Sequence, residues 1–354
     1  MERAHNFFAG PAVLPVEVLK SSAQAVLDFG QGMGLIEMSH RSKEFDKVIN
    51  DAVANMRDVM EIPENYKILF MTGGASTQFA LVPMNFLKGS ADYIDTGSWS
   101  SKAIKEAKLF GNVNVVFSGK ADAYRQIPAE FKTNPDADYL HVTSNNTIYG
   151  TQFQKFPDSG KVPMICDMSS DIMCRRVDIS QFAMIYAGAQ KNMGPAGVTI
   201  AIVRDDLLAK VPETLPTMFK YTTYSEENSL YNTPPVFPIY VVGEVLKWLK
   251  GLGGIDAIEK INRHKAGLIY EVLDKYPCYK PHAASDSRSL MNITWTMETP
   301  ELEAALLEEA KKRRMFGLKG HRSVGGLRAS IYNACPVESC EALRDLLVEF
   351  AEKL

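Results

Sequence analysis

Two short apolar runs in the middle of the chain, residues 162–166 and 182–187, constrain the fold more than any other feature. Their length and their β-branched and aromatic residues are typical of strands buried in a parallel sheet. Asp167 directly follows the first run, and Lys191 lies shortly after the second. A doubly wound sheet gathers its chemistry at the carboxyl ends of its strands, so we expect this acid and this amine to meet over one ligand.

An acid and a lysine at one sheet edge suit pyridoxal phosphate. A lysine forms a Schiff base with the cofactor aldehyde, and a carboxylate keeps the pyridine nitrogen protonated so that the ring withdraws electrons. Each residue also has an ordinary interpretation. A lysine after a strand is usually a solvated loop residue, and an aspartate that closes a strand is often the N-cap of the next turn. Spacing alone leaves both interpretations open.

Composition excludes several classes of protein. The chain has 354 residues and a net charge of −3, which gives no reason to expect nucleic acid or an anionic membrane as a partner. The five cysteines are odd in number and form no C-x-x-C pair, so neither a disulfide framework nor a metal site is indicated. The N-terminus lacks the apolar core of a signal peptide, and no run approaches the ~20 apolar residues of a membrane span, so we expect a cytoplasmic protein.

Strand and helix patterns alternate along most of the chain, which predicts an α/β fold with a doubly wound sheet. Glycines at 251, 253 and 254 mark a hinge. Beyond it, single helices separate a few strands, which predicts a small second α+β domain. Residues 212–235 have an irregular polar and aromatic composition that favours a functional or interface loop.

Two further segments offer binding groups. Gly73 and Gly74 precede Ala75 and Ser76 at the start of a helix, an arrangement that suits either an anion seat or a simple helix cap. Neither a G-x-G-x-x-G nor a P-loop motif occurs, which weakens dinucleotide and P-loop interpretations. Trp99 follows a strand, where it could stack on a flat ring, although core packing is the commoner role.

The dipeptide His-Arg occurs twice, at His40-Arg41 and His321-Arg322, and Arg328 follows soon after the second. Arginine offers a planar fork for phosphate or carboxylate, and histidine adds a donor that can gain charge. Solvated surface pairs are the alternative.

Taken together, these pieces resemble the phosphoserine aminotransferase family of class V aminotransferases. The resemblance covers essentially the whole chain, in order and spacing, and rests on F-F-A-G-P-A, M-S-H-R-S, T-G-G-A-S-T-Q-F, D-T-G-S-W-S, N-N-T-I-Y-G, C-D-M-S-S-D-I, A-G-A-Q-K-N-M-G-P-A-G, N-T-P-P and G-L-R-A-S-I-Y-N-A. It implies the fold type I architecture of pyridoxal phosphate enzymes: a large domain over residues 15–252 with a mainly parallel seven-stranded sheet, and a small α+β domain from residues 1–14 and 253–354.

The resemblance also implies roles for individual residues. Lys191 would be the Schiff-base lysine and Asp167 the partner of the pyridine nitrogen. The other cofactor contacts would be Trp99 on the ring, Thr147 near the ring hydroxyl, Ala75, Ser76 and Gln190 at the phosphate, and Asn232 and Thr233 reaching that phosphate from the second subunit of a homodimer. Substrate would be bound by His40, Arg41, His321 and Arg322 at its phosphate and by Arg328 at its α-carboxylate. Some family members carry arginine at the position of Ser76, which leaves the role of that side chain open.

The implied reaction is transamination between L-glutamate and 3-phosphohydroxypyruvate, which gives O-phospho-L-serine and 2-oxoglutarate in serine biosynthesis. The family also offers 4-phosphohydroxy-L-threonine, an intermediate of vitamin B6 synthesis, as a second substrate. A cysteine desulfurase of the same fold is an alternative, for which Cys335 is the nearest candidate nucleophile. A non-catalytic protein that binds pyridoxal phosphate is another.

Overall fold

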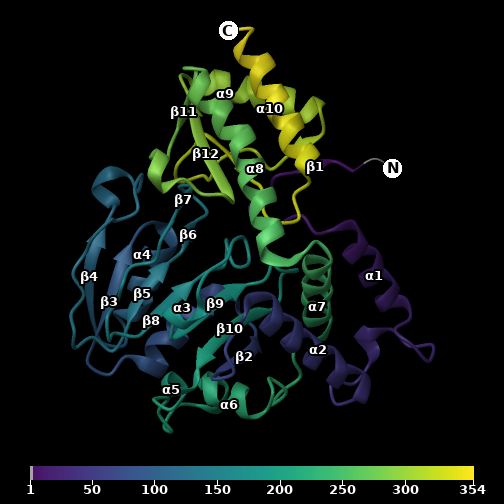
Figure 1. Cartoon of the computed structure of the whole chain (residues 1–354), viewed down its shortest axis with the longest axis vertical. Coiled ribbons are helices and arrows are strands. Elements are labelled where there is room, and N and C mark those ends of the chain that lie inside the picture. Colours follow the sequence, from purple (N-terminus) through teal and green to yellow (C-terminus); the bar gives the residue numbers. More distant parts are fainter. Residues whose placement is uncertain (1–2) are drawn as a thin grey trace.

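The computed structural model describes residues 3–354, and its largest element is a seven-stranded sheet (Figure 1). In spatial order the strands are β2 (Tyr66–Met71), β10 (Thr199–Arg204), β9 (Met184–Gly188), β8 (Met164–Asp167), β5 (Leu140–Thr143), β3 (Ser90–Asp95) and β4 (Asn112–Ser118). Neighbouring strands from β9 to β4 are parallel, and β10 runs antiparallel to both β9 and β2. The predicted doubly wound, mainly parallel sheet is confirmed.

Alternate residues of each strand point to opposite faces of the sheet. Because the strands are apolar at successive positions, both faces carry apolar side chains, and helices cover both. Ile68 and Phe70 pack into one core with α2 (Lys43–Met60) and α7 (Val236–Gly251). Leu69 and Met71 pack into a second core, on the side of α3 (Gly74–Phe86), α4 (Ser98–Ala107) and α6 (Tyr221–Glu226). Strands that are apolar at successive positions are therefore buried on both faces, as their sequences indicate.

Local sequence signals explain where several helices begin. The Ser42 hydroxyl accepts a hydrogen bond from the Phe45 amide and caps α2. The one clear difference from expectation lies within residues 212–235, where α6 forms. Its Tyr221 and Tyr224 are buried against the sheet, so tertiary packing stabilises a helix too short to show a periodic pattern. The other α-helices and strands of this part are α1 (Val16–Leu27), α5 (Asp205–Leu208), β6 (Asn145–Asn146) and β7 (Thr151–Gln152).

A smaller α+β unit lies above the large sheet in Figure 1. It contains the antiparallel sheet β11 (Tyr279–Pro281), β12 (Asn292–Met297) and β14 (Leu327–Ser330), with α8 (Gly254–Lys275), α9 (Pro300–Lys312) and α10 (Val337–Ala351). The N-terminal arm joins it: β1 (His5–Asn6) pairs with β13 (Met315–Phe316), and Phe7 enters its separate hydrophobic core. We propose residues 15–252 as one domain and residues 1–14 with 253–354 as the other, with the start of α8 still packed on the first core.

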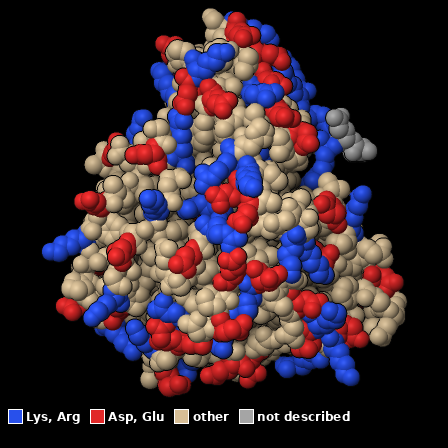
Figure 2. Space-filling view, viewed as in Figure 1, with Lys and Arg blue, Asp and Glu red and all other residues tan. Residues whose placement is uncertain are grey.

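Within the described residues, no helix is long and apolar enough to cross a membrane. Figure 2 shows acidic and basic side chains interspersed over the face seen in Figure 1. On this face, therefore, charge is mixed in sign rather than gathered into a single-sign field.

The junction between β14 and α10 is held by a buried lysine. Lys265 of α8 is fully buried, and its Nζ donates to the carbonyl oxygens of Ile331, Tyr332, Asn333 and Cys335 at 3.1, 2.8, 3.5 and 3.2 Å. Burial lowers the pKa of this amine. One ammonium thus donates to four carbonyl groups of this turn, of which that of Tyr332 also accepts from the Cys335 amide at 2.9 Å.

We expect Lys265→Met to lower the free energy of unfolding by about 2–4 kcal/mol, because methionine fills the space but cannot donate a hydrogen bond to these buried carbonyl groups. Urea unfolding followed by circular dichroism measures the change. Lys260→Met, at an exposed position of the same helix, is the matched control and should stay within about 0.5 kcal/mol of the parent. Equal stability of the two variants would contradict the anchoring role.

Candidate active site

The carboxyl ends of β8 and β9 open onto a cavity of about 230 Å³. Asp167, the last residue of β8, and Lys191, in the loop after β9, both line it. Of the residues predicted from the sequence, the cavity brings together Ala75, Ser76, Trp99, Thr147, Asp167, Gln190 and Lys191. The expected meeting of acid and amine at one edge of the sheet is therefore found.

Lys191 is half-buried and held in a defined position. Its Nζ donates to the Thr147 hydroxyl at 2.8 Å and lies 5.4 Å from the centroid of the Trp99 ring. Burial lowers the pKa of Lys191 to about 8; the negative charge of Asp167 opposes this shift, and the positive charge of Arg328 adds to it. About a tenth of the amine is thus neutral at pH 7, far more than in a solvated lysine.

Asp167 is 4% exposed, and its Oδ1 accepts a hydrogen bond from the Ser169 amide at 2.9 Å. Asp167 therefore caps the turn that follows β8, as one of the two interpretations expected, and it also lines the cavity. Burial raises the pKa of Asp167, while the Ser169 hydrogen bonds and the charge of Lys191 lower it. The Ser169 hydroxyl accepts from the Gly188 amide at 3.2 Å, which ties this turn to β9.

The N-terminus of α3 forms another wall of the cavity. Gly73 and Gly74 have φ angles of +90° and +65°, and a Cβ on Gly73 would lie 2.0 Å from the Thr77 hydroxyl oxygen. Only glycine fits this approach. The first amide groups of a helix have no intrahelical acceptor, so this end of α3 suits an anion. The Thr143 hydroxyl, buried in the same cavity, also lacks a partner.

The cavity also contains residues that the sequence reasoning did not select, namely Thr143, Asn145, Ser169 and Ser170. Asn145 belongs to a polar turn after a strand, which was a usable signal, and the serines follow Asp167 within one motif. A second omission is the N-terminal arm. The Ala12 amide donates to the Gln190 carbonyl at 2.9 Å, and a Cβ on Gly10, whose φ is +140°, would lie 3.2 Å from Lys191 Cγ.

The second His-Arg pair and Arg328 belong to the small unit. Arg328 Nη1 donates to the Thr147 carbonyl at 3.1 Å, and its buried Nε has no partner. Burial lowers the pKa of His321, and the positive charges of Arg328, Arg322 and Lys102 lower it further. Arg328 therefore borders the cavity through Thr147, whereas His321 and Arg322 are not among the residues that line it.

Other predicted residues lie elsewhere on the same chain. His40 and Arg41 line a separate cavity of about 430 Å³ together with Glu227 and Leu230. Asn232 and Thr233 are exposed and do not line the cavity of Lys191. Cys335, the desulfurase candidate, lines a third cavity of about 260 Å³ and not that of Lys191.

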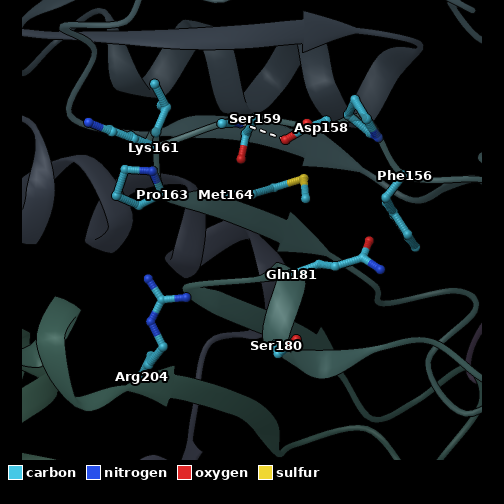
Figure 3. Close-up of a pocket in the computed structure, with 12 residues that line it drawn as sticks. Phe156, Asp158, Ser159, Lys161, Pro163, Met164, Ser180, Gln181 and Arg204 are labelled. Atoms are coloured by element: carbon cyan, nitrogen blue, oxygen red, sulfur yellow. Dashed lines mark hydrogen bonds between the residues drawn. The ribbon is translucent and has the colours of Figure 1, made fainter.

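A larger cavity of about 340 Å³ lies at the opposite edge of the sheet, at the start of β8 (Figure 3). Its charged groups include Lys161, Asp158 and Arg204, and Arg204 is already paired with Asp206 through a 2.6 Å hydrogen bond. None of the residues selected from the sequence lines it. The predicted catalytic and cofactor-binding residues that line a cavity at an edge of the sheet therefore lie in the smaller one, that of Lys191.

Comparison with known proteins agrees with this geometry. The family model described as Aminotransferase class-V matches residues 4–343. A phosphoserine aminotransferase of Lysinibacillus sphaericus (strain C3-41) is 54% identical over 358 residues, which cover 99% of each chain. The chain belongs to the phosphoserine aminotransferase family.

Solved structures of phosphoserine aminotransferases share the fold along their whole length. The protein from Bacillus circulans subsp. alkalophilus is 52% identical, with a TM-score of 0.98 over 100% of this chain and 99% of that one. The phosphoserine aminotransferase from Trichomonas vaginalis, solved with pyridoxal phosphate bound, is 37% identical, with a TM-score of 0.93 over 98% and 100%. The fold type I architecture expected from the sequence is that of the family.

Proposed function

We propose that this chain transfers the amino group of L-glutamate to 3-phosphohydroxypyruvate with pyridoxal phosphate bound in the Lys191 cavity. The observation that carries the proposal is one cavity that joins a lysine of lowered pKa, a buried carboxylate, an aromatic ring and a helix N-terminus. These groups fit the cofactor's aldehyde, pyridine nitrogen, ring face and phosphate in turn. When bound, the cofactor supplies an electron-withdrawing ring that stabilises the carbanion formed when the substrate α-carbon loses its proton.

The chain's own residues hold the cofactor and move the proton. Lys191 Nζ would hold the cofactor at its aldehyde and would carry the α-carbon proton, because its lowered pKa suits a base near neutral pH. Asp167 would keep the pyridine nitrogen protonated, and Trp99 would stack on the ring. Thr147 holds Lys191 Nζ and bonds near the ring hydroxyl. Ala75, Ser76 and Gln190, which line the cavity, would surround the phosphate.

Substrate selection falls to cationic groups in the loops. Arg328, whose buried Nε has no partner, binds the substrate α-carboxylate. His40, Arg41, His321 and Arg322 bind the phosphate of one substrate and the γ-carboxylate of the other, a task that suits adaptable loops rather than a rigid slot.

We also propose a cytoplasmic homodimer with shared active sites. His40, Arg41, Asn232 and Thr233 lie outside the cavity of their own chain, which supports a role in the site of a second copy. Light scattering measures the molar mass; a monomer at working concentration would contradict the shared site.

The test of the reaction is direct. Purified protein with pyridoxal phosphate, L-glutamate and 3-phosphohydroxypyruvate should release 2-oxoglutarate and form O-phospho-L-serine in equal amounts. Omission of either substrate is the control. A visible cofactor band without this transfer would favour the non-catalytic alternative, and alanine release from cysteine would favour the desulfurase.

The pH dependence of cofactor capture follows from Lys191. Only the neutral amine attacks an aldehyde, so below the pKa of about 8 the capture rate of the cofactor-free protein should fall about tenfold per pH unit and level off above it. Stopped-flow absorbance after mixing with pyridoxal phosphate measures the rate. Free N-acetyl-lysine is the control and should level off only above about pH 10.4. If the capture rate of the protein also levelled off only above about pH 10.4, this result would contradict the lowered pKa of Lys191.

Loss of a cationic side chain from these loops should lower the catalytic efficiency with the phosphorylated substrate. We expect Arg41→Ala and Arg322→Ala each to lower kcat/KM for 3-phosphohydroxypyruvate about 10- to 100-fold, the worth of a hydrogen bond between charged groups. Steady-state kinetics with both substrates measures the change. Arg263→Ala, an exposed arginine of α8 that pairs with Glu259, is the control. Unchanged values for 3-phosphohydroxypyruvate in both loop variants would remove these residues from the site.

A further inference from the structure

One hydroxyl group in the wall of the Lys191 cavity is not engaged by the rest of the chain. Other polar side chains of that wall are hydrogen-bonded: Asn145 Nδ2 donates to the Ser170 hydroxyl at 2.8 Å, and the Thr147 hydroxyl accepts from Lys191 Nζ at 2.8 Å. The Thr143 hydroxyl is buried in the same cavity, yet within the described residues it has no hydrogen-bond partner. Its position therefore needs an explanation other than the packing of the chain.

An unpartnered hydroxyl at this position works against folding. It gives up its hydrogen bonds to water and gains none in return, whereas a valine side chain would fill the same space without that cost. A buried polar group without a partner is uncommon in folded proteins, and a functional role is one explanation for it. In a cavity that already joins a lysine, an acid and an aromatic ring, the Thr143 hydroxyl suits a role in binding.

The next strand carries a suitable acceptor, the Asp167 carboxylate. Thr143 ends β5 and Asp167 ends β8, and these parallel strands pair the two residues directly. Paired residues of neighbouring strands point to the same face of a sheet, with the strands about 4.8 Å apart, and both side chains line the cavity. The Ser169 amide occupies one lone pair of Asp167 Oδ1, and a carboxylate offers about four. Asp167 can thus accept a further hydrogen bond from its neighbour.

We propose that Thr143 is a positioning residue: in the protein with pyridoxal phosphate bound, its hydroxyl donates to the Asp167 carboxylate and fixes that group on the pyridine nitrogen. The inference rests on the proposed function and adds to it a residue that acts through Asp167 rather than on the cofactor itself. A hydrogen bond donated to a carboxylate favours its charged form, which is the form that supports a protonated pyridine nitrogen. The hydroxyl that folding leaves without a partner is thereby used when the cofactor binds.

Two valine variants separate a role in binding from a role in folding. Thr143→Val should unfold at the same or a higher temperature than the cofactor-free parent, but its Kd for pyridoxal phosphate, measured by absorbance titration, should rise about tenfold, the worth of one hydrogen bond. Thr199→Val is the matched control, because Thr199 begins β10 and also has a buried, unpartnered hydroxyl within the described residues but does not line the cavity. It should show the parent's Kd. Thr143→Ser, which restores the hydroxyl, should bring the Kd back to within about threefold of the parent.

A double variant tests whether Thr143 acts through Asp167. In an Asp167→Ala background the carboxylate is gone, so Thr143→Val should then change the Kd by less than about twofold. A parent-like Kd for Thr143→Val, an equal rise for Thr199→Val, or a tenfold rise that persists without Asp167 would each overturn the proposal. So would a cofactor-free Thr143→Val that unfolds well below Thr199→Val, since the hydroxyl would then be structural. A parent protein that binds no pyridoxal phosphate would overturn the proposed function as well, which distinguishes the two failures.

Discussion

Lys191→Ala is expected to abolish the visible absorbance of bound pyridoxal phosphate and to lower the transamination rate by at least about 10⁴-fold, because both the bonding amine and the base are removed. The half-buried side chain contacts Thr147 and Trp99 but supports no core cluster, so stability should change little. Absorbance titration with the cofactor and release of 2-oxoglutarate measure the two effects.

Lys265→Met is the matched control for Lys191→Ala, since Lys265 is the other lysine with a pKa lowered by burial. It should keep the absorbance band at temperatures where it is folded, while it unfolds more easily. The opposite pattern, a band retained without Lys191, would remove this residue from the chemistry.

Asp167→Asn is expected to lower kcat about 10- to 1000-fold, because an opposite charge nearby shifts a pKa by about 1–3 units and the pyridine nitrogen would lose that support. Asparagine keeps the shape and can still accept from the Ser169 amide, so the fold should persist. Steady-state kinetics at saturating cofactor measures kcat. Asp92→Asn, a fully buried acid of β3 that bonds Asn114 and Asn134 outside the cavity, should keep its activity, and equal losses in both would contradict the assignment.

The sequence was most informative where local pattern and chemistry coincide. The apolar runs that become β8 and β9 predicted both the sheet and the meeting of Asp167 with Lys191. The two glycines before Ala75 likewise predicted the start of α3 and one wall of the cavity. In each case a backbone requirement and a functional group lie within a few residues of each other.

Other parts of the site depend on contacts that local pattern does not contain. The pairing of β1 with β13 joins residues about three hundred positions apart through two-residue strands, below the length at which alternation is visible. The approach of Gly10 to Lys191 and of Arg328 to Thr147 is equally a product of tertiary folding. His40 and Asn232 lie outside the Lys191 cavity of their own chain, and nothing in the local pattern around them indicates this.

The N-terminal arm touches both halves of the molecule. His5 and Asn6 are hydrogen-bonded to the small unit, and a few residues later Gly10 and Ala12 lie against the loop that carries Lys191. Because this short segment is attached at both places, any rotation of the small unit would pull on the loop of Lys191. If the small unit closed over a substrate, the movement would thus reach the Lys191 amine through the backbone, without any side chain having to relay it.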